Sequence, residues 1–335
     1  MRQIATYAGL IPMAFFGVLI RLGFEALGDY EGRTVYPVLW AQGVGCAIMG
    51  TSLSLKSEIH EFYPPLYTAL TTGLAGSTTS FSSWMLDGFE SFANLGHYDR
   101  GGLRDAMDGL AYSFSTLAVS IACLLFGQFS GSLIQHWLDT YREKSHRRAN
   151  NSIGLEKKQM RIKTNDYQHT IVFDSVSIAL ACAFYAGALA AYFAGPRQWR
   201  PDVTFALLLG PPGAILRFML AKINTKGRFL TRFPMGTFVA NMLASGVVSA
   251  SYVVQRTAYN TGLTTTGCDA MIALEQGFCG CLSTVSTFAV EIRSIDRARW
   301  KATYVLTSVV LGHALVLAIV GGVKWSPEGL GPFCR

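Results

Sequence analysis

The chain has 335 residues, of which 50% are hydrophobic and only 15% are Asp, Glu, Lys or Arg. Soluble globular proteins average about 25% charged residues, so this composition excludes disorder and argues strongly against a soluble enzyme or a nucleic-acid-binding protein. The seven cysteines show no metal-ligand spacing. The formal net charge of +7 is simply explained by basic loops on one side of a membrane.

Apolar stretches of about 20 residues alternate with short polar joints, and each stretch can cross the hydrocarbon core of a bilayer. We therefore predict an all-α polytopic membrane protein with nine transmembrane helices. The first span closely follows Met1 and contains Arg21, so we interpret it as a retained helix and not as a cleaved signal peptide. The predicted spans are 5–27, 34–54, 65–91, 105–132, 169–193, 202–222, 234–255, 269–291 and 301–323.

The only long polar stretch lies between the fourth and fifth spans, from His136 to Gln168, and it is rich in Lys and Arg. Because positively charged loops stay in the cytosol, this stretch predicts the orientation of every span. The N-terminus is then cytosolic and the C-terminus lies outside. Of the 20 Lys and Arg residues outside this stretch, ten fall on the inner side, eight on the outer side and two within spans.

Spans one to four and six to nine are predicted to be copies of each other. The first spans share Gly17-Val-Leu-Ile-Arg21 and Gly213-Ala-Ile-Leu-Arg217, and the third spans align 73–84 with 277–288 without a gap. The extra fifth span makes the second copy enter the bilayer upside down, and inverted repeats place a substrate path at their interface. The predicted domains are a first four-helix repeat (1–135), a cytosolic basic loop (136–168), a linking transmembrane helix (169–195) and a second, inverted repeat (196–335).

Gly, Ser and Thr cluster in the middle of both third spans, at 73–83 and 277–287. Small residues at helix interfaces commonly serve packing, and that alternative stays open for any one of them. The joint pattern in both copies favours a broken helix. Its freed carbonyl groups would face a cavity or an ion, because unpaired backbone cannot face lipid.

Polar side chains inside other spans have two interpretations each. Asn241 is either a hydrogen-bonding link between helices or a neutral N–H donor to a permeating anion, and Gln42 holds the corresponding place in the first copy. The hydroxyls of Tyr112, Thr116 and Ser120 recur every four residues and form one stripe on a helix. Such a stripe fits a wet path better than hydrogen bonds to the i−4 carbonyl.

Charged residues inside spans are few. Arg21 and Arg217 are costly in apolar surroundings, and they either snorkel to the membrane rim or line a cavity where they attract an anion. Asp87 and Asp174 lie near span ends, where a carboxylate needs no special role.

At these residues the sequence resembles the Fluc/FEX family of fluoride channels. The match rests on 209–218, on 236–241 and on both third-span motifs, and it covers every span except the fifth. The resemblance implies the eukaryotic fused form of a channel whose bacterial members are antiparallel dimers. It implies passive fluoride export across the plasma membrane by a single fused chain, no enzymatic activity and no nucleic-acid partner.

The resemblance also implies roles for individual residues. The implied fluoride pathway is Asn241, Phe81, Phe288, Ser82, Ser83, Ser286, Thr287, Tyr112, Thr116 and Ser120. The positions of the second pore, predicted to be vestigial, are Gln42, Trp84, Val285, Tyr304 and Ser308. A structural sodium ion is implied at the carbonyl groups of Gly76, Thr79, Gly280 and Ser283, with Arg21 and Arg217 in vestibule or structural roles.

The family's pattern predicts a single working pore, because each path takes one aromatic residue from each copy. Phe81 and Phe288 complete one pair, whereas Val285 and Trp84 leave the other incomplete. We group the complete pair with Asn241 and the first-copy hydroxyls.

Two alternatives from other classes remain. A coupled transporter of cations or small molecules would need a central carboxylate in the first span of each copy, and Glu25 lies near the rim. A scaffold without transport activity would leave the paired polar stretches unexplained.

Overall fold

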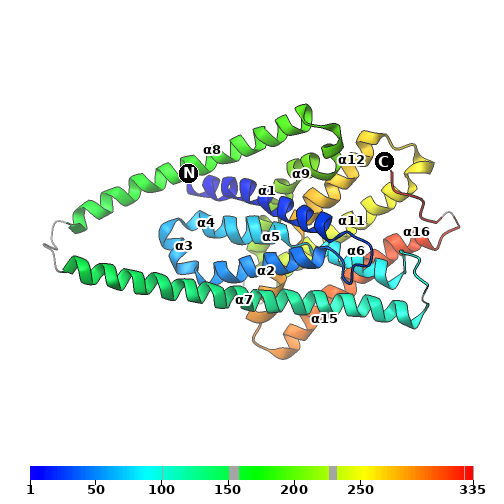
Figure 1. Ribbon diagram of the computed structural model, residues 1–335, viewed down its shortest axis with the longest axis horizontal. Coiled ribbons are helices and arrows are strands. Elements are labelled where there is room, and N and C mark those ends of the chain that lie inside the picture. The colour runs from blue at the N-terminus through cyan, green and yellow to red at the C-terminus, as the bar shows by residue number, and fades with distance from the viewer. Residues whose placement is uncertain (100, 151–157, 226–231, 328, 335) are drawn as a thin grey trace.

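The computed structural model describes the chain except for residues 100, 151–157, 226–231, 328 and 335. Every regular element in the described residues is a helix (Figure 1). The long helices α7 and α8 run along opposite sides of the molecule and approach each other at one end.

The first copy begins with two helices, α1 (Arg2–Gly28) and α2 (Val38–Ser54). A bend of 72° separates α2 from the short helix α3 (Lys56–Phe62). The predicted third span is a series of pieces: α4 (Pro64–Thr68), the π-helix η1 (Ala69–Ala75), α5 (Gly76–Thr78) and α6 (Phe81–Phe92). The long helix α7 (Leu103–Asn150) follows.

The second copy follows α8 (Lys158–Ala194) and repeats this order. Two short turns, η2 (Arg197–Trp199) and η3 (Arg200–Thr204), lead into α9 (Phe205–Ala221), which η4 (Lys222–Thr225) extends. After α11 (Met235–Thr261), the predicted eighth span again consists of pieces: α12 (Thr265–Ala273), the π-helix η5 (Leu274–Cys279), α13 (Gly280–Leu282) and α14 (Ser286–Ser294). The last elements are α15 (Ala298–Val316), η6 (Leu317–Gly321) and α16 (Gly322–Lys324).

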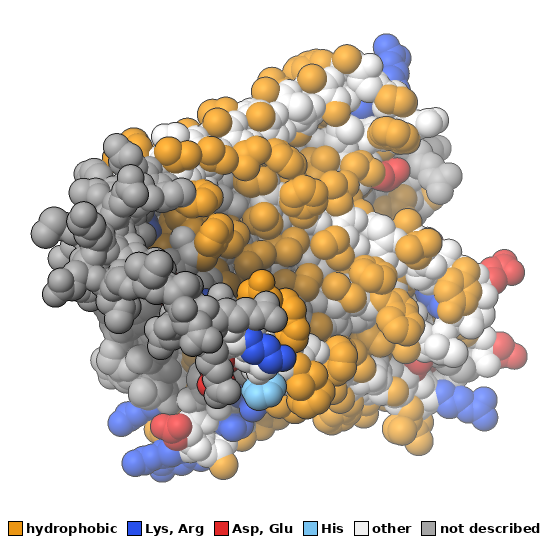
Figure 2. Space-filling view, turned by 60° about the vertical axis from the view of Figure 1, so that its left-hand side comes forward, with side chains coloured by type: hydrophobic (Ala, Val, Ile, Leu, Met, Phe, Trp, Pro, Cys, Tyr) orange, Lys and Arg blue, Asp and Glu red, His pale blue; other side chains and the backbone are white. Residues whose placement is uncertain are grey.

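Six helices in the described residues are long and apolar enough to cross a membrane, or seven if the bent pair α2–α3 is one span. This establishes a multi-pass membrane protein. The two predicted third spans are not among the six because each is interrupted halfway, so the count of nine stays a prediction. Figure 2 shows hydrophobic side chains over most of the described part of one face, with charged side chains mainly toward its margins.

The basic stretch 136–168 is not the loop that its composition indicated. Helices α7 and α8 continue through 136–150 and 158–168, and only 151–157 lie outside the described residues. Lys, Arg, Glu and Gln are good helix formers. The polar composition therefore does not mark where these helices end.

A disulfide that the sequence did not predict joins Cys268 to Cys334, at the start of α12 and in the C-terminal tail. The tail also lies along the end of α11, where Gly331 N–H donates to the Arg256 carbonyl at 3.0 Å. The guanidinium of Arg256 stacks on the ring of Phe333 at 3.9 Å. These contacts hold residues 331–334 against α11 and α12.

Candidate site at the paired helix breaks

Both third segments are interrupted at equivalent positions, in the region where small polar residues predicted a break. The backbone is extended at Thr79 (φ −94°, ψ 143°) and Ser80 (φ −136°, ψ 114°) in the first copy. It is extended at Ser283 (φ −85°, ψ 159°) in the second. The half-helices α5 and α13 pack against each other. The two breaks therefore meet in the interior of the protein.

Each break is capped by a hydroxyl group from the other copy. The backbone N–H groups of Val285 and Ser286 donate to Oγ1 of Thr79 at 3.2 and 3.1 Å. In the equivalent place, the N–H of Ser82 donates to Oγ of Ser283 at 3.1 Å. A helix N-terminus has unsatisfied N–H groups that a hydroxyl oxygen accepts well. Thr79 of the first copy therefore caps the start of α14, and Ser283 of the second copy caps the start of α6.

Three predicted pathway hydroxyls are part of this network. Ser82 shares a hydrogen bond with Ser283 at 2.9 Å, and Ser83 shares one with Ser80 at the same distance. Ser286 accepts from Thr79 at 3.1 Å. Thr287 joins the network only through its backbone N–H, which donates to Thr284 at 3.4 Å. The structure thus brings these hydroxyls together at the breaks.

The two equivalent carboxamides hold the extended segments in place. Asn241 accepts from Thr284 N–H at 2.9 Å and donates to the Thr284 carbonyl at 3.3 Å. Gln42 accepts from Ser80 N–H at 3.2 Å and donates to the Ser80 carbonyl at 2.7 Å. These contacts match the hydrogen-bonding interpretation of Asn241. A carboxamide nitrogen carries two N–H groups, so each side chain keeps one further donor.

The rings of Phe81 and Phe288 are in contact, with centroids 5.6 Å apart and planes at 74°. Phe288 also packs on Tyr304, with centroids 5.1 Å apart. A Cβ atom built on Gly312 would lie 3.1 Å from the Phe81 ring. Tyr304 and Gly312 both belong to α15, so the phenylalanine pair lies beside the hydroxyl stripe of the second copy. These contacts do not support the predicted grouping with the first-copy stripe.

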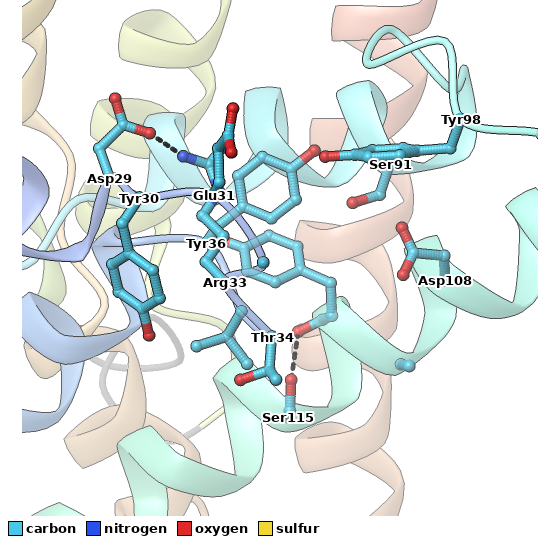
Figure 3. Close-up of a pocket in the computed structure, with 14 residues that line it drawn as sticks. Asp29, Tyr30, Glu31, Arg33, Thr34, Tyr36, Ser91, Tyr98, Asp108 and Ser115 are labelled. Carbon is cyan, nitrogen blue, oxygen red and sulfur yellow. Dashed lines mark hydrogen bonds and ion pairs between the residues drawn. The ribbon is translucent and has the colours of Figure 1, made fainter.

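The first-copy stripe leads from an open pocket of about 890 Å³ (Figure 3). Tyr36 and Tyr112 line this pocket with ring centroids 4.8 Å apart. Further along α7, Ser120 donates to the Thr116 carbonyl at 2.7 Å, which is the i−4 hydrogen bond that the sequence disfavoured for this stripe. The hydroxyl of Thr116 is buried without a hydrogen-bond partner among the described residues, and the same is true of Ser308 at the equivalent place in α15.

Two carboxylates anchor the tyrosines of the stripes: Asp87, which was expected to have no special role, and Glu291, which the sequence did not single out. Tyr112 donates to Asp87 at 3.0 Å, and Tyr304 donates to Glu291 at 2.7 Å. Asp87 and Glu291 occupy equivalent positions, three residues after Trp84 and Phe288 in the aligned third segments. That alignment was the signal that could have identified them. Glu291 also accepts from Thr237 at 2.6 Å.

Arg21 and Arg217 lie buried inside the protein, which does not support snorkelling for either. Their side chains are buried, with 0% and 3% of the residue surface exposed. Arg217 donates to the carbonyl groups of Gly76 at 2.6 Å and Ser283 at 3.1 Å. Arg21 donates to the Ser77 carbonyl at 3.0 Å. The guanidinium groups therefore lie between the two breaks.

This arrangement bears on the sodium ion that the family resemblance implied. Gly76 and Ser283 supply two of the four predicted carbonyl ligands, and both accept from the same nitrogen of Arg217. A Cβ atom built on Gly76 would lie 2.7 Å from Cζ of Arg217, and one on Gly280 would clash with the guanidinium of Arg21. The guanidinium of Arg217 lies between the Gly76 and Ser283 carbonyls, so these two carbonyls do not fit a sodium ion.

The comparisons with known proteins agree with this two-copy architecture. The family model described as "CrcB-like protein, Camphor Resistance (CrcB)" matches residues 9–128 and again residues 204–322. No solved structure matches the chain.

Curated relatives cover nearly the whole chain. "Fluoride export protein 1" of Candida albicans is 28% identical over 95% of this chain and 79% of its own length. "Fluoride export protein 1" of Schizosaccharomyces pombe is 28% identical over 93% of this chain and 94% of its own length. "Fluoride-specific ion channel FluC" of Phocaeicola vulgatus is 30% identical, but its match covers 36% of this chain and 92% of its own length. The chain therefore belongs to the CrcB-like protein family, as a form that joins two copies of the family's unit in one polypeptide.

Proposed function

We propose that the protein is a passive fluoride channel that lets cytosolic fluoride leave the cell across the plasma membrane. The observation that carries this proposal is the match of both halves to one family, together with full-length relatives named for fluoride export. The protein performs no catalysis in this account. A single chain suffices, because both copies of the unit are present.

The chemistry beside the breaks suits a small, strongly hydrated anion. Hydroxyl and carboxamide groups can replace the water that fluoride loses, and neither group titrates near neutral pH. The edge of an aromatic ring carries partial positive charge and can also face an anion. The buried hydroxyls of Thr116 and Ser308, which lack partners among the described residues, are free to serve as such donors.

The contacts support two related paths of unequal quality. Helix α11, which carries Asn241, packs against α6 and α15. A path beside α15 would therefore be bordered by Asn241, Phe81, Phe288, Tyr304 and Ser308. This set contains both phenylalanines and the asparagine that the family resemblance implies for a working pore. Only the third hydroxyl of its stripe is missing, at Gly312.

The path beside α7 keeps all three hydroxyls but has lost its other features. Helix α2, which carries Gln42, packs against α7 and α14. The remaining aromatic positions, Trp84 and Val285, then belong to this path. We propose that fluoride passes beside α15 and that the path beside α7 is vestigial. This assigns Tyr304 and Ser308 to the working pore and the first-copy hydroxyls to the other one.

The disulfide supports the predicted orientation. Disulfides persist in oxidising surroundings and are rare in the cytosol. The bond between Cys268 and Cys334 favours a C-terminus that lies outside the cell. The opposite end of the molecule, where α7 and α8 extend with many basic residues, is then cytosolic.

Survival of a fluoride-sensitive host tests the proposal. Cells that lack their own exporter and express this chain should grow at fluoride concentrations that stop cells with an empty vector. The Phe288→Ile variant, expressed at the same level, should fail to protect them. Equal growth of wild-type and empty-vector cells, with the protein present in the membrane, would contradict fluoride export.

A further inference from the structure

The two buried arginines bind equivalent backbone carbonyl groups, each in the copy opposite its own. Arg217 of α9 donates to the carbonyl groups of Gly76 and Thr72 in the first copy. Arg21 of α1 donates to the Gln276 carbonyl in the second copy. Thr72 and Gln276 occupy equivalent positions in the π-helices η1 and η5. Each arginine therefore links its own copy to the other one.

Three of the carbonyl groups that the arginines contact, those of Gly76, Ser77 and Ser283, lie at the ends of the interrupted helices, where few backbone N–H groups are available to pair with them. A helix that stops has no N–H groups to pair with its last carbonyls, and its C-terminal end carries partial negative charge. Helices α5 and α13 stop at the breaks and pack against each other. Two such ends buried together are stabilised by positive charge and by hydrogen-bond donors. A guanidinium group supplies five N–H donors in a planar fork.

A glycine one turn before each arginine permits the approach. A Cβ atom built on Gly17 would lie 2.7 Å from the Cβ of Ser77, and one on Gly213 would lie 3.0 Å from the carbonyl carbon of Phe278. Without these glycines, α1 and α9 could not lie close enough for Arg21 and Arg217 to reach the breaks. The Gly-x-x-x-Arg motif thus has one geometric purpose in both copies.

We infer that Arg21 and Arg217 are the cations that neutralise the paired breaks, so that the protein folds and conducts without a bound sodium ion. A sodium ion bound to the Gly76 and Ser283 carbonyls would have to displace Arg217 from both. It would also lie beside positive charge in surroundings of low dielectric constant, where like charges repel strongly.

The stability of the purified wild-type protein in different salts is the first test. A ligand that binds only the folded state raises its melting temperature with concentration. We expect the melting temperature to be the same in sodium chloride and in N-methyl-D-glucamine chloride of equal ionic strength. A saturating rise of roughly 5 °C or more with sodium would overturn the inference. This measurement does not involve fluoride transport, so it stands even if the proposed function fails.

Variants of the arginine provide the second test. Arg217→Gln should lower the melting temperature by roughly 5 °C or more, whereas Arg297→Gln, which removes an exposed arginine, should leave it unchanged. If Arg217→Gln yields no folded protein, Arg217→Lys should fold with a lower melting temperature, because lysine keeps the charge but loses the fork. A wild-type melting temperature in Arg217→Gln, or in Arg217→Lys, would contradict the inference.

Discussion

The hydroxyl oxygen of Thr79 accepts a hydrogen bond at 3.1 Å from the backbone N–H of Ser286, a residue of the other copy. The start of α14 is therefore completed by a side chain that lies 207 residues away in sequence. In the same way, the hydroxyl oxygen of Ser283 accepts a hydrogen bond from the backbone N–H of Ser82. Neither break can form its final structure until both copies are folded and packed together.

The first prediction concerns these reciprocal caps. Thr79→Ala should destabilise the protein by about 1 to 2 kcal/mol, the usual cost of losing a helix N-cap. Thr79→Ser keeps the hydroxyl and should retain most of the stability. Chemical or thermal unfolding of the purified variants measures the difference. Equal stability of the Ala and Ser variants would show that the hydroxyl does not act as a cap.

The second prediction concerns the glycines that face the guanidinium groups. Gly76→Val and Gly280→Val should sharply reduce the yield of folded protein, because any Cβ there meets Arg217 or Arg21. Gly187→Val is the matched control, since a Cβ built on Gly187 meets nothing within 4 Å. The yield of monodisperse protein after detergent extraction measures the effect. Normal yields of Gly76→Val and Gly280→Val would contradict close packing between these glycines and the guanidinium groups.

The third prediction decides which path conducts by removing one hydroxyl from each stripe. Tyr304→Phe should lower fluoride efflux by about tenfold or more, because it removes the hydroxyl whose hydrogen bond to Glu291 anchors this side chain beside α15. Tyr112→Phe makes the same change beside α7 and should leave efflux nearly unchanged. Initial rates from reconstituted vesicles measure both.

Further variants extend that comparison to the aromatic and carboxamide positions. Phe288→Ile and Asn241→Asp should abolish export, whereas Trp84→Phe and Gln42→Asn should preserve it. Comparable losses from both sets would mean that both paths conduct. The reverse pattern would move the working pore to α7, with the first-copy hydroxyls that the sequence grouped with it.

The fourth prediction concerns orientation. Glu143→Cys places a thiol on the exposed part of α7 that is predicted to lie in the cytosol. An impermeant maleimide should label it only after the cells are opened. Cells that express the wild-type protein, which has five free cysteines, give the background labelling. Ready labelling of the variant in intact cells would invert the topology.

Much of the architecture could be predicted from residue patterns alone. The two copies were visible because their third segments align without a gap, and the breaks were visible because Gly, Ser and Thr cluster in otherwise apolar segments. These are local properties of the sequence. The break positions follow from them because only backbone buried in protein can depart from a helix at that depth.

Other features depend on contacts between distant residues, and the sequence could not supply them. Arg217 donates to the carbonyl of Gly76, which lies 141 residues away in sequence. No local pattern near either residue indicated this contact. The grouping of Phe81 and Phe288 with α15 depends on the direction in which each helix face points, which residue spacing does not determine. The prediction of a loop at 136–168 was wrong because a change to polar composition indicates different surroundings and does not indicate the end of a helix.

The most direct measurement is fluoride efflux from vesicles that contain only the purified chain. Vesicles loaded with potassium fluoride are placed in fluoride-free buffer without any proton or sodium gradient, and valinomycin provides the compensating potassium current. A passive channel predicts rapid release that starts with valinomycin and is unchanged by a proton ionophore. Release no faster than from protein-free vesicles, or release only when a proton or sodium gradient is imposed, would contradict the account.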